Sequence, residues 1–254
     1  MQKAISCLLL SLVLSFHCAG WGPTGHRVTG WVAEKYLTKK ARTAIAKILR
    51  GESLVMASTW MDEIRSDSTY DHMADWHWVT VPEETSYEDA VKNPNGDIIQ
   101  TLERVMAKLR NKNLSQKQQL EHLRILIHLV GDLHQPLHVG AGDDRGGNNV
   151  RVMWFGDQSN LHRIWDSDMI DDTRLSYTEL AQSLESPDED QIREWQKSSI
   201  YDWARESQSY HSSVYNYDSG PLGYRYTYVN FPIVRLRLLQ AGVRLAGILN
   251  QIYG

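Results

Sequence analysis

Residues 114–138, LSQKQQLEHLRILIHLVGDLHQPLH, carry the clearest pattern in the chain. Apolar residues recur there at helical spacing, Ser115 is a typical N-cap residue, and Pro136 prevents the helix from continuing. We therefore predict a helix over residues 114–133. The same spacing predicts further helices over residues 28–49, 97–109, 179–184, 188–206 and 232–253.

Strand patterns are sparse. They are confined to residues 77–81 and 150–155, on either side of the glycine-rich residues 140–147. These two segments could pair as a small hairpin. The chain has no internal repeat, low-complexity tract or linker, so we expect an all-α, mainly helical, single compact domain.

The first twenty residues have the features of a signal peptide. Lys3 gives a positive start, residues 4–16 are apolar, and Cys18 and Gly20 are small residues before a cut at Trp21. The apolar run is too short for a membrane span, so we expect a secreted or periplasmic protein with a domain over residues 21–254. Cys7 and Cys18 are the two cysteines of the chain, so the processed protein would contain no disulfide.

The charge balance excludes a protein that grips nucleic acid with a basic groove. The chain has 31 Asp and Glu against 27 Lys and Arg, and removal of residues 1–20 takes away one more cation, Lys3. If the substrate is a phosphodiester, metal ions must supply most of the positive charge.

Two pairs of residues point to metal binding. His128 and Asp132 are four residues apart on the predicted helix, so their side chains leave the same face, and Pro136 lets His138 fold back toward it. His162 and Asp166 repeat this spacing. Imidazole and carboxylate together suit zinc. One such pair is more often an exposed or hydrogen-bonded couple, but two pairs favour a metal site.

Three further segments support this prediction. Asp62 lies in WMDEIR, His77 lies in DWHW, and WGPTGH runs from Trp21 to His26. Cleavage before Trp21 would free an α-amine with a pKa of about 8, which deprotonates readily and can chelate a cation together with the carbonyl oxygen.

In order along the chain, these motifs resemble those of the S1/P1 nuclease family. The resemblance runs from Trp21 to Asp166 and is most specific in HQPLH, which ends at His138, and in NLHRIWD, which ends at Asp166. It implies the helical fold shared with zinc phospholipase C and a cluster of three zinc ions. It also implies cleavage of single-stranded RNA and DNA to 5′-phosphate products, with 3′-nucleotidase activity.

The resemblance also implies the role of each residue. The first zinc would be held by Asp62, His77 and His128. Asp132 would bridge it to a second zinc on His26 and on the amine and carbonyl of Trp21. The third zinc would be held by His138, His162 and Asp166.

Fewer side chains are implied in contact with the substrate. Arg65 and the third zinc would stabilise the charge that develops on the leaving oxygen. Asn148 would contact phosphate or shape its loop, and Trp78 would stack on a base or be an ordinary core tryptophan. Many family members have an Asp three residues after the His77 equivalent, which is thought to orient water, whereas this chain has Thr80.

Other candidates are weaker. The Asp143-Asp144-Arg145 run is interpreted as a solvated loop, although Arg145 and Arg151 could meet phosphate. His134 lies on a different helical face from His128 and is expected to make a structural hydrogen bond.

Two other functions remain open. A zinc phospholipase C has the same fold, although that family typically closes its last site with His-x3-Glu, where this chain has His162 and Asp166. The other is a non-catalytic exported protein stabilised by zinc, which stays open because Thr80 cannot act as a carboxylate base. We expect a monomer that acts on nucleic acid and nucleotides and does not enter a membrane.

Overall fold

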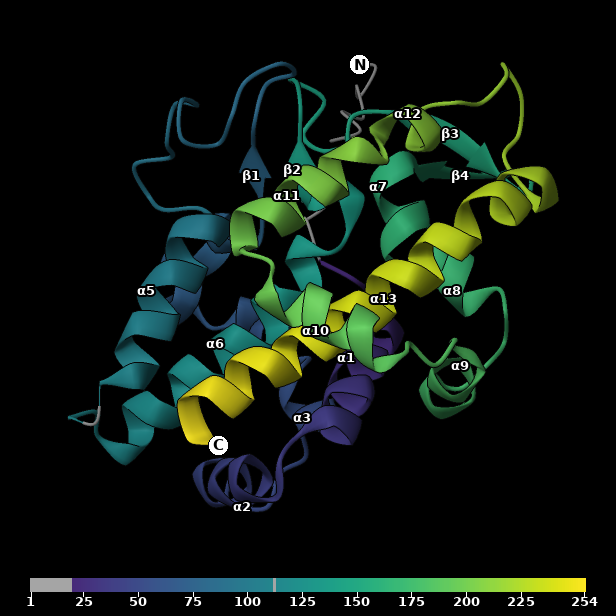
Figure 1. Cartoon of the computed structure of the whole chain (residues 1–254). Coiled ribbons are helices and arrows are strands. Elements are labelled where there is room, and N and C mark those ends of the chain that lie inside the picture. Colours follow the sequence, from purple (N-terminus) through teal and green to yellow (C-terminus); the bar gives the residue numbers. More distant parts are fainter. Residues whose placement is uncertain (1–19, 112) are drawn as a thin grey trace, which may run out of the picture.

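The computed structural model describes residues 20–111 and 113–254. Helices make up most of it, as the sequence predicts (Figure 1). The longer helices are α1 (Pro23–Tyr36), α2 (Lys39–Ile48), α5 (Ile98–Arg110), α6 (Gln116–Leu133), α9 (Tyr177–Ser183), α10 (Glu189–Lys197), α11 (Ile200–Ser209) and α13 (Tyr224–Tyr253). The shorter ones are α3 (Leu54–Ala57), α4 (Trp60–Glu63), η1 (Ile64–Ser66), η2 (Ser68–His77), η3 (Pro136–His138), α7 (Leu161–Arg163), η4 (Ile164–Asp168), α8 (Met169–Asp171) and α12 (His211–Val214).

The predicted hairpin between residues 77–81 and 150–155 is wrong, because each segment has another partner. β1 (Val79–Thr80) pairs in parallel with β2 (Val139–Gly140), directly after η3. β3 (Arg151–Trp154) pairs antiparallel with β4 (Asp157–Asn160) across a tight turn at Phe155 and Gly156, which both have positive φ. The β1–β2 pair matters for function because it places His77 beside His138.

Two predicted helices are each divided in two. Residues 28–49 break at Leu37, which is extended, and Thr38 caps α2 by accepting a hydrogen bond from the Ala41 amide. Residues 188–206 break at Ser198, and Ser199 begins α11 with a capping box. In both places a local side-chain cap competes successfully with continuation of the helix.

Helix α13 is longer than predicted, because it starts at Tyr224 and continues through Pro232. It crosses the whole molecule in Figure 1 and packs most extensively against α1. Gly242 permits this packing, since a Cβ atom there would lie 2.5 Å from the Val32 side chain. None of the described helices is long and apolar enough to cross a membrane.

The core has two parts, and α1 contributes to both, with Ala33 in one and Val28 and Val32 in the other. One part gathers α2, α5 and most of α6, and the other gathers Trp21, α7, η4 and the first half of α13. The polar groups at the ends of α1 and α6 are therefore enclosed by apolar residues on two sides, which excludes water from them.

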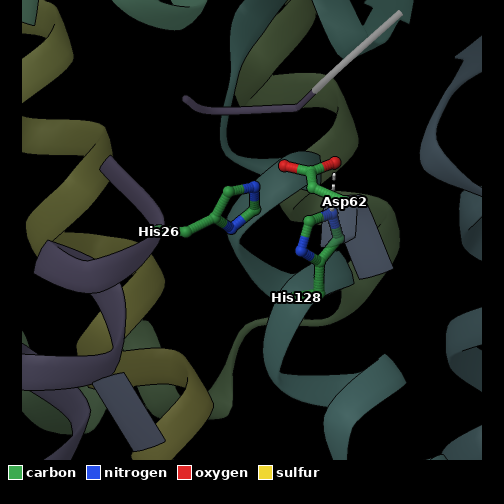
Figure 2. A group of neighbouring side chains, drawn as sticks. All are labelled: His26, Asp62 and His128. Atoms are coloured by element: carbon green, nitrogen blue, oxygen red, sulfur yellow. Dashed lines mark ion pairs between the residues drawn. The ribbon is translucent and has the colours of Figure 1, made fainter. Parts of the chain in front are cut away.

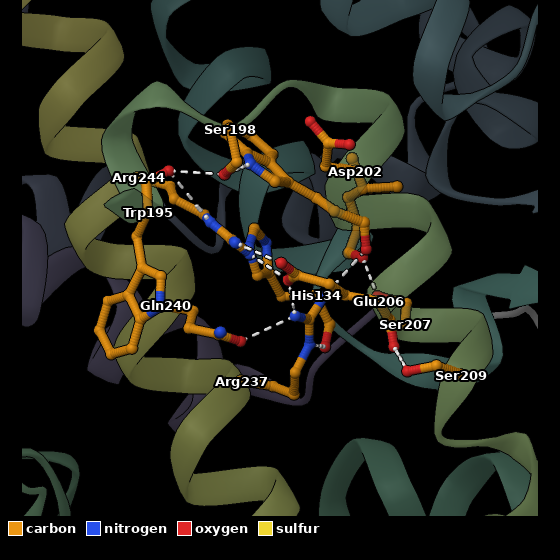
Figure 3. Close-up of polar contacts among 12 residues, drawn as sticks. His134, Trp195, Ser198, Asp202, Glu206, Ser207, Ser209, Arg237, Gln240 and Arg244 are labelled. Carbon is orange, nitrogen blue, oxygen red and sulfur yellow. Dashed lines mark hydrogen bonds and ion pairs between the residues drawn. The ribbon is translucent and has the colours of Figure 1, made fainter. Parts of the chain in front are cut away.

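The buried polar network in Figure 3 joins α6, α11 and α13. Glu206 accepts hydrogen bonds from Arg237 and Arg244, whose side chains are buried. His134 donates from Nδ1 to the Val130 carbonyl and accepts at Nε2 from Arg244. The structural role predicted for His134 is confirmed, and the network fixes the end of α6 against two other helices.

Candidate metal centre

Asp132 is the hub of a buried cluster. One of its oxygens, Oδ2, lies 2.8 Å from His77 Nδ1 and 3.2 Å from His128 Nε2. The other, Oδ1, lies 3.2 Å from His26 Nε2. The His26 and His128 rings stack with centroids 3.9 Å apart. All four side chains are at most 4% exposed, so these segments, distant in sequence, share a dry site.

Asp62 faces the same cluster from α4. Figure 2 shows its carboxylate above the His26 and His128 rings, with Oδ1 3.7 Å from His128 Nε2. Arg65, one turn further on, places Nη2 2.7 Å from the same oxygen. The structure groups Asp62 with His26 and His128, and His77 with His128 and Asp132, so the five ligand candidates form one continuous set.

The third predicted group is also assembled. His162 Nε2 lies 3.0 Å from Asp166 Oδ2, and His138 Nε2 lies 3.8 Å from Asp166 Oδ1. His162 and Asp166 span the junction of α7 and η4, a turn of π-helix, which is a deviation common at functional sites.

The histidines are held by backbone carbonyls, which fix their protonation. Nδ1 of His128, His138 and His162 donates to the carbonyls of Ser58, His77 and Gly146, at 2.7, 2.6 and 2.6 Å respectively. A proton on Nδ1 leaves the Nε2 lone pair for a metal, an arrangement typical of metal-binding histidines. Gly146 is required here, since a Cβ atom on it would lie 2.2 Å from the Leu137 carbonyl.

Unsatisfied atoms indicate that the cluster fits metal ions. His26 Nε2, Asp62 Oδ1 and Asp132 Oδ1 are buried and make no hydrogen bond of good geometry with a described residue: His26 Nε2 and Asp132 Oδ1 face each other at 3.2 Å, and Asp62 Oδ1 has the Arg65 guanidinium beside it. Tetrahedral zinc with bonds of about 2.0–2.1 Å separates its ligand atoms by about 3.3 Å. The 3.0–3.8 Å separations between the imidazole nitrogens and carboxylate oxygens bracket this value, apart from the shorter His77–Asp132 contact.

The electrostatics agree with metal binding. Burial lowers the pKa of His26, and it lowers the pKa of His138 to about 3, so both imidazoles are neutral at pH 7, the form that binds metal. Burial alone would raise the pKa of Asp132, but the neighbouring His128 holds it well below its usual range. Burial alone would lower the pKa of His128, but Asp132 and Asp62 raise it, which shows that the buried carboxylates favour a cation beside them, and a metal ion would meet the same need.

Gln135 is a site residue that the sequence reasoning missed. It is fully buried, and its Nε2 donates to Asp166 Oδ1 at 2.5 Å while its Oε1 accepts from the Leu137 amide. Burial raises the pKa of Asp166 to about 6, and the amide opposes this shift. Its place between His134 and Pro136 in HQPLH is a signal that could have found it.

The start of the described chain lies in the site. Trp21 is fully buried, and the Gly22 amide donates to the Asp166 carbonyl. A Cβ atom on Gly20 would lie 1.5 Å from Asp132 Oδ1, so the Gly20–Trp21 bond lies against the hub carboxylate. The predicted signal peptide covers residues 1–20, and all but its last residue lie outside the described residues.

A pocket of about 270 Å³ adjoins the cluster, and its lining includes Trp78, Thr80, Arg145 and Asn148. Trp78 follows His77 directly and is half-buried, so it is not an enclosed core residue. Asn148 Nδ2 donates to the Arg145 carbonyl at 3.0 Å, which shapes the loop. Arg151 lines a different cavity.

Comparison with known proteins agrees with this geometry. The S1/P1 Nuclease family model matches residues 21–254. Endonuclease 4 and Endonuclease 3 of Arabidopsis thaliana are 29% and 30% identical, and each alignment covers 92% of this chain and 89% of the relative. Nuclease P1 of Penicillium citrinum is 30% identical over 59% of this chain and 58% of its own length. The chain therefore belongs to the S1/P1 nuclease family and is an enzyme that hydrolyses the phosphodiester bonds of nucleic acid.

Proposed function

We propose that the chain is a zinc nuclease of single-stranded RNA and DNA that holds three zinc ions. The observation that carries the proposal is the set of buried imidazole nitrogens that converge on the Asp132 carboxylate at 2.8–3.2 Å, the spacing of atoms that share a metal ion. Two groups of ligand candidates share His128, and the third lies around Asp166. The three groups of ligand candidates equal in number the three predicted zinc ions.

We assign the ligands as the family resemblance implies. Asp62, His77 and His128 would hold the first ion, and Asp132 would be shared between the first and the second. His26 and the α-amine and carbonyl of Trp21 would complete the second, and His138, His162 and Asp166 would hold the third.

The Trp21 assignment requires removal of residues 1–20. The contact between Gly20 and Asp132 supports it, because an amide nitrogen would stand where a free amine can bind. The family match, which starts at Trp21, supports export and cleavage at the same place. Secretion or release into a periplasm follows from such processing.

Zinc in such a site lowers the pKa of bound water to about 7 and draws charge from a phosphoryl oxygen. Side chains of the protein position the phosphate and stabilise the charge on the leaving oxygen. The Arg65 guanidinium, 27% exposed beside Asp62, is placed to donate to the phosphate and to stabilise the charge that develops on the leaving 3′-oxygen. Asn148, half-buried at the pocket, is placed to position a phosphate.

The preference for single strands comes from Trp78. Its ring lines the pocket beside His77, and a base must leave a duplex to stack there. Breakage of the bond to the 3′-oxygen gives a 5′-phosphate product. The same attack on a terminal 3′-phosphate accounts for 3′-nucleotidase activity. No further protein residue is needed for either reaction, so a monomer is sufficient.

The test begins with exported protein whose N-terminus is confirmed as Trp21. Zinc content is measured together with cleavage of single-stranded RNA, single-stranded DNA, duplex DNA and phosphatidylcholine. The matched pair of variants is His128→Asn and His122→Asn. Both lie on α6, but His122 is half-buried, and among the described residues its ring bonds to the Gln118 carbonyl of the same helix.

We expect about three zinc ions per chain, cleavage of single strands that a chelator abolishes, and loss of activity in H128N but not in H122N. Full zinc content with no cleavage of nucleic acid would contradict the proposal. The lipid result would then separate a phospholipase from a purely structural zinc cluster. A form with one extra residue before Trp21 should lose the second zinc and regain it after that residue is removed.

A further inference from the structure

The pocket beside the metal centre carries polar groups that the proposed chemistry does not use. Besides Trp78 and Asn148, its lining includes Thr80, Asp143 and Arg145. The pocket is joined to the third metal group, because the Gly146 carbonyl accepts a hydrogen bond from His162. A base stacked on Trp78 would therefore present its edge to this loop while its phosphate lies at the metals.

The loop holds Arg145 in an unusual backbone conformation. Its φ is +56°, a value that residues other than glycine adopt rarely. The Asn148 backbone amide and side-chain amide both donate to the Arg145 carbonyl, and the Asn149 amide donates to the Asp144 carbonyl. A backbone fixed in this way is a feature of ligand sites, because it presents one side chain in a defined direction.

The Asp144 carboxylate, next to Arg145 in sequence, already has a hydrogen-bond partner. Asp144 accepts a hydrogen bond of 2.5 Å from the Tyr215 hydroxyl and is half-buried, whereas Asp143 and Arg145 are exposed, as expected of a solvated loop. Among the described residues, the Arg145 guanidinium has no hydrogen bond or ion pair, and neither has the Asp143 carboxylate. The pocket thus offers a ligand the N–H donors of the planar Arg145 guanidinium and the two acceptor oxygens of the Asp143 carboxylate.

We infer that this pocket is a guanine site and that Arg145 is its specificity-determining residue, an inference that rests on the proposed function. Arginine pairs with the adjacent O6 and N7 acceptors of guanine in the commonest specific contact between proteins and bases. Guanine also carries donors, N1–H and the N2 amine, that suit the Asp143 carboxylate. Adenine has a donor at the position of O6, and the pyrimidines lack N7, so neither satisfies both groups.

The test uses processed, zinc-loaded protein and single-stranded oligonucleotides that differ at one central nucleotide. That nucleotide is guanine, adenine, cytosine, uracil, 7-deazaguanine or inosine, and cleavage is measured at the bonds that flank it. 7-Deazaguanine lacks the N7 acceptor, and inosine lacks the N2 amine. Affinities for guanosine and adenosine 5′-monophosphates and for inorganic phosphate are measured in parallel. The variants are Arg145→Met, which has no hydrogen-bond donor, Asp143→Asn and, as a matched control outside the pocket, Arg151→Met.

We expect the unmodified protein to favour guanine over adenine, 7-deazaguanine and inosine by at least about fivefold. R145M should remove the preferences over adenine and 7-deazaguanine, D143N should remove the preference over inosine, and R151M should keep all three. Near-ultraviolet circular dichroism checks that the loop variants remain folded.

An equal loss for every base, with weaker binding of inorganic phosphate, would overturn the inference and make Arg145 a phosphate contact. An unchanged preference for guanine in R145M would overturn it as well. A protein that cleaves nothing yet binds the guanosine nucleotide more tightly through Arg145 would refute the proposed function and support the guanine site.

Discussion

Replacement of Glu206 by Gln tests whether the buried network beneath the metal centre stabilises the fold. Glu206 lies on α11 and pairs with Arg237 and Arg244 of α13, at 2.6 Å in each case. Both guanidinium groups are almost fully enclosed, with side chains 0% and 1% exposed, whereas the Glu206 side chain is 36% exposed. The variant keeps the shape of this side chain but removes its charge, which leaves two buried cations without a counterion.

The expected cost follows from this burial. Removal of one partner of a fully buried ion pair costs about 3–5 kcal/mol. Because water reaches part of Glu206 and screens the charges, we expect a smaller fall in the free energy of unfolding, about 2 kcal/mol. In a domain of this size that corresponds to a melting temperature lower by roughly 4–8 °C.

The effect should depend on pH. Burial alone would raise the pKa of Glu206, but Arg244 and Arg237 lower it below its usual value. A lowered folded-state pKa contributes stability above the unfolded pKa of about 4.3, and this contribution is lost as the pH falls through the folded pKa. The difference between the two proteins should therefore be full at pH 7 and shrink below about pH 4.

Urea denaturation followed by circular dichroism measures this difference, with chelator in every sample so that metal loss does not contribute. The control is Glu189→Gln, the same change in an ion pair with Arg193 whose glutamate is 89% exposed, and it should leave stability unchanged. If E206Q is as stable as the unmodified protein at pH 7, or if its deficit does not change with pH, the reasoning is refuted.

Three other changes test the site and its support. Asp132→Asn should reduce the bound zinc and lower cleavage of single-stranded RNA by at least about 100-fold, since the hub contacts three histidines. Gln135→Met should weaken zinc binding or activity by about 10–100-fold while the protein stays folded, because it removes the amide that orients Asp166. Ser115→Ala breaks the capping box with Gln118 at the start of α6 and should lower the free energy of unfolding by about 1 kcal/mol, measured in urea, with unchanged cleavage.

The sequence predicts the helices best where a local signal marks the end. Ser115 and Asp97 cap α6 and α5 as their side chains suggest, and the predicted ends are close to the observed ones. Strand pairing is harder, because β1 and β2 are two residues each and their register depends on the position of η3. A strand of two residues is too short to show the alternation of apolar and polar residues from which strands and their partners are predicted.

The site residues also differ in how well the local sequence predicts them. The spacing of His128 and Asp132 reveals a shared helical face, and the structure brings them together. The contact between Gln135 and Asp166 joins residues from separate elements and leaves no local pattern. Burial of Arg237 depends in the same way on Glu206, a residue of another helix, so helical periodicity alone assigns it to the surface.

Most of the metal centre and the pocket are built on different supports. Two of the histidines, His128 and His138, are fixed by the carbonyls of Ser58 and His77 at the ends of helices, so a small shift there would disturb the core as well. The pocket groups Asp143 and Arg145 extend from a surface loop that is anchored at Gly146. Substitutions at Asp143 and Arg145 are expected to change which base is read as long as Gly146, whose carbonyl fixes His162, keeps its place. In a chain whose acidic residues outnumber its basic ones, the two proposals together assign attraction for the substrate to the metal centre and discrimination to the loop.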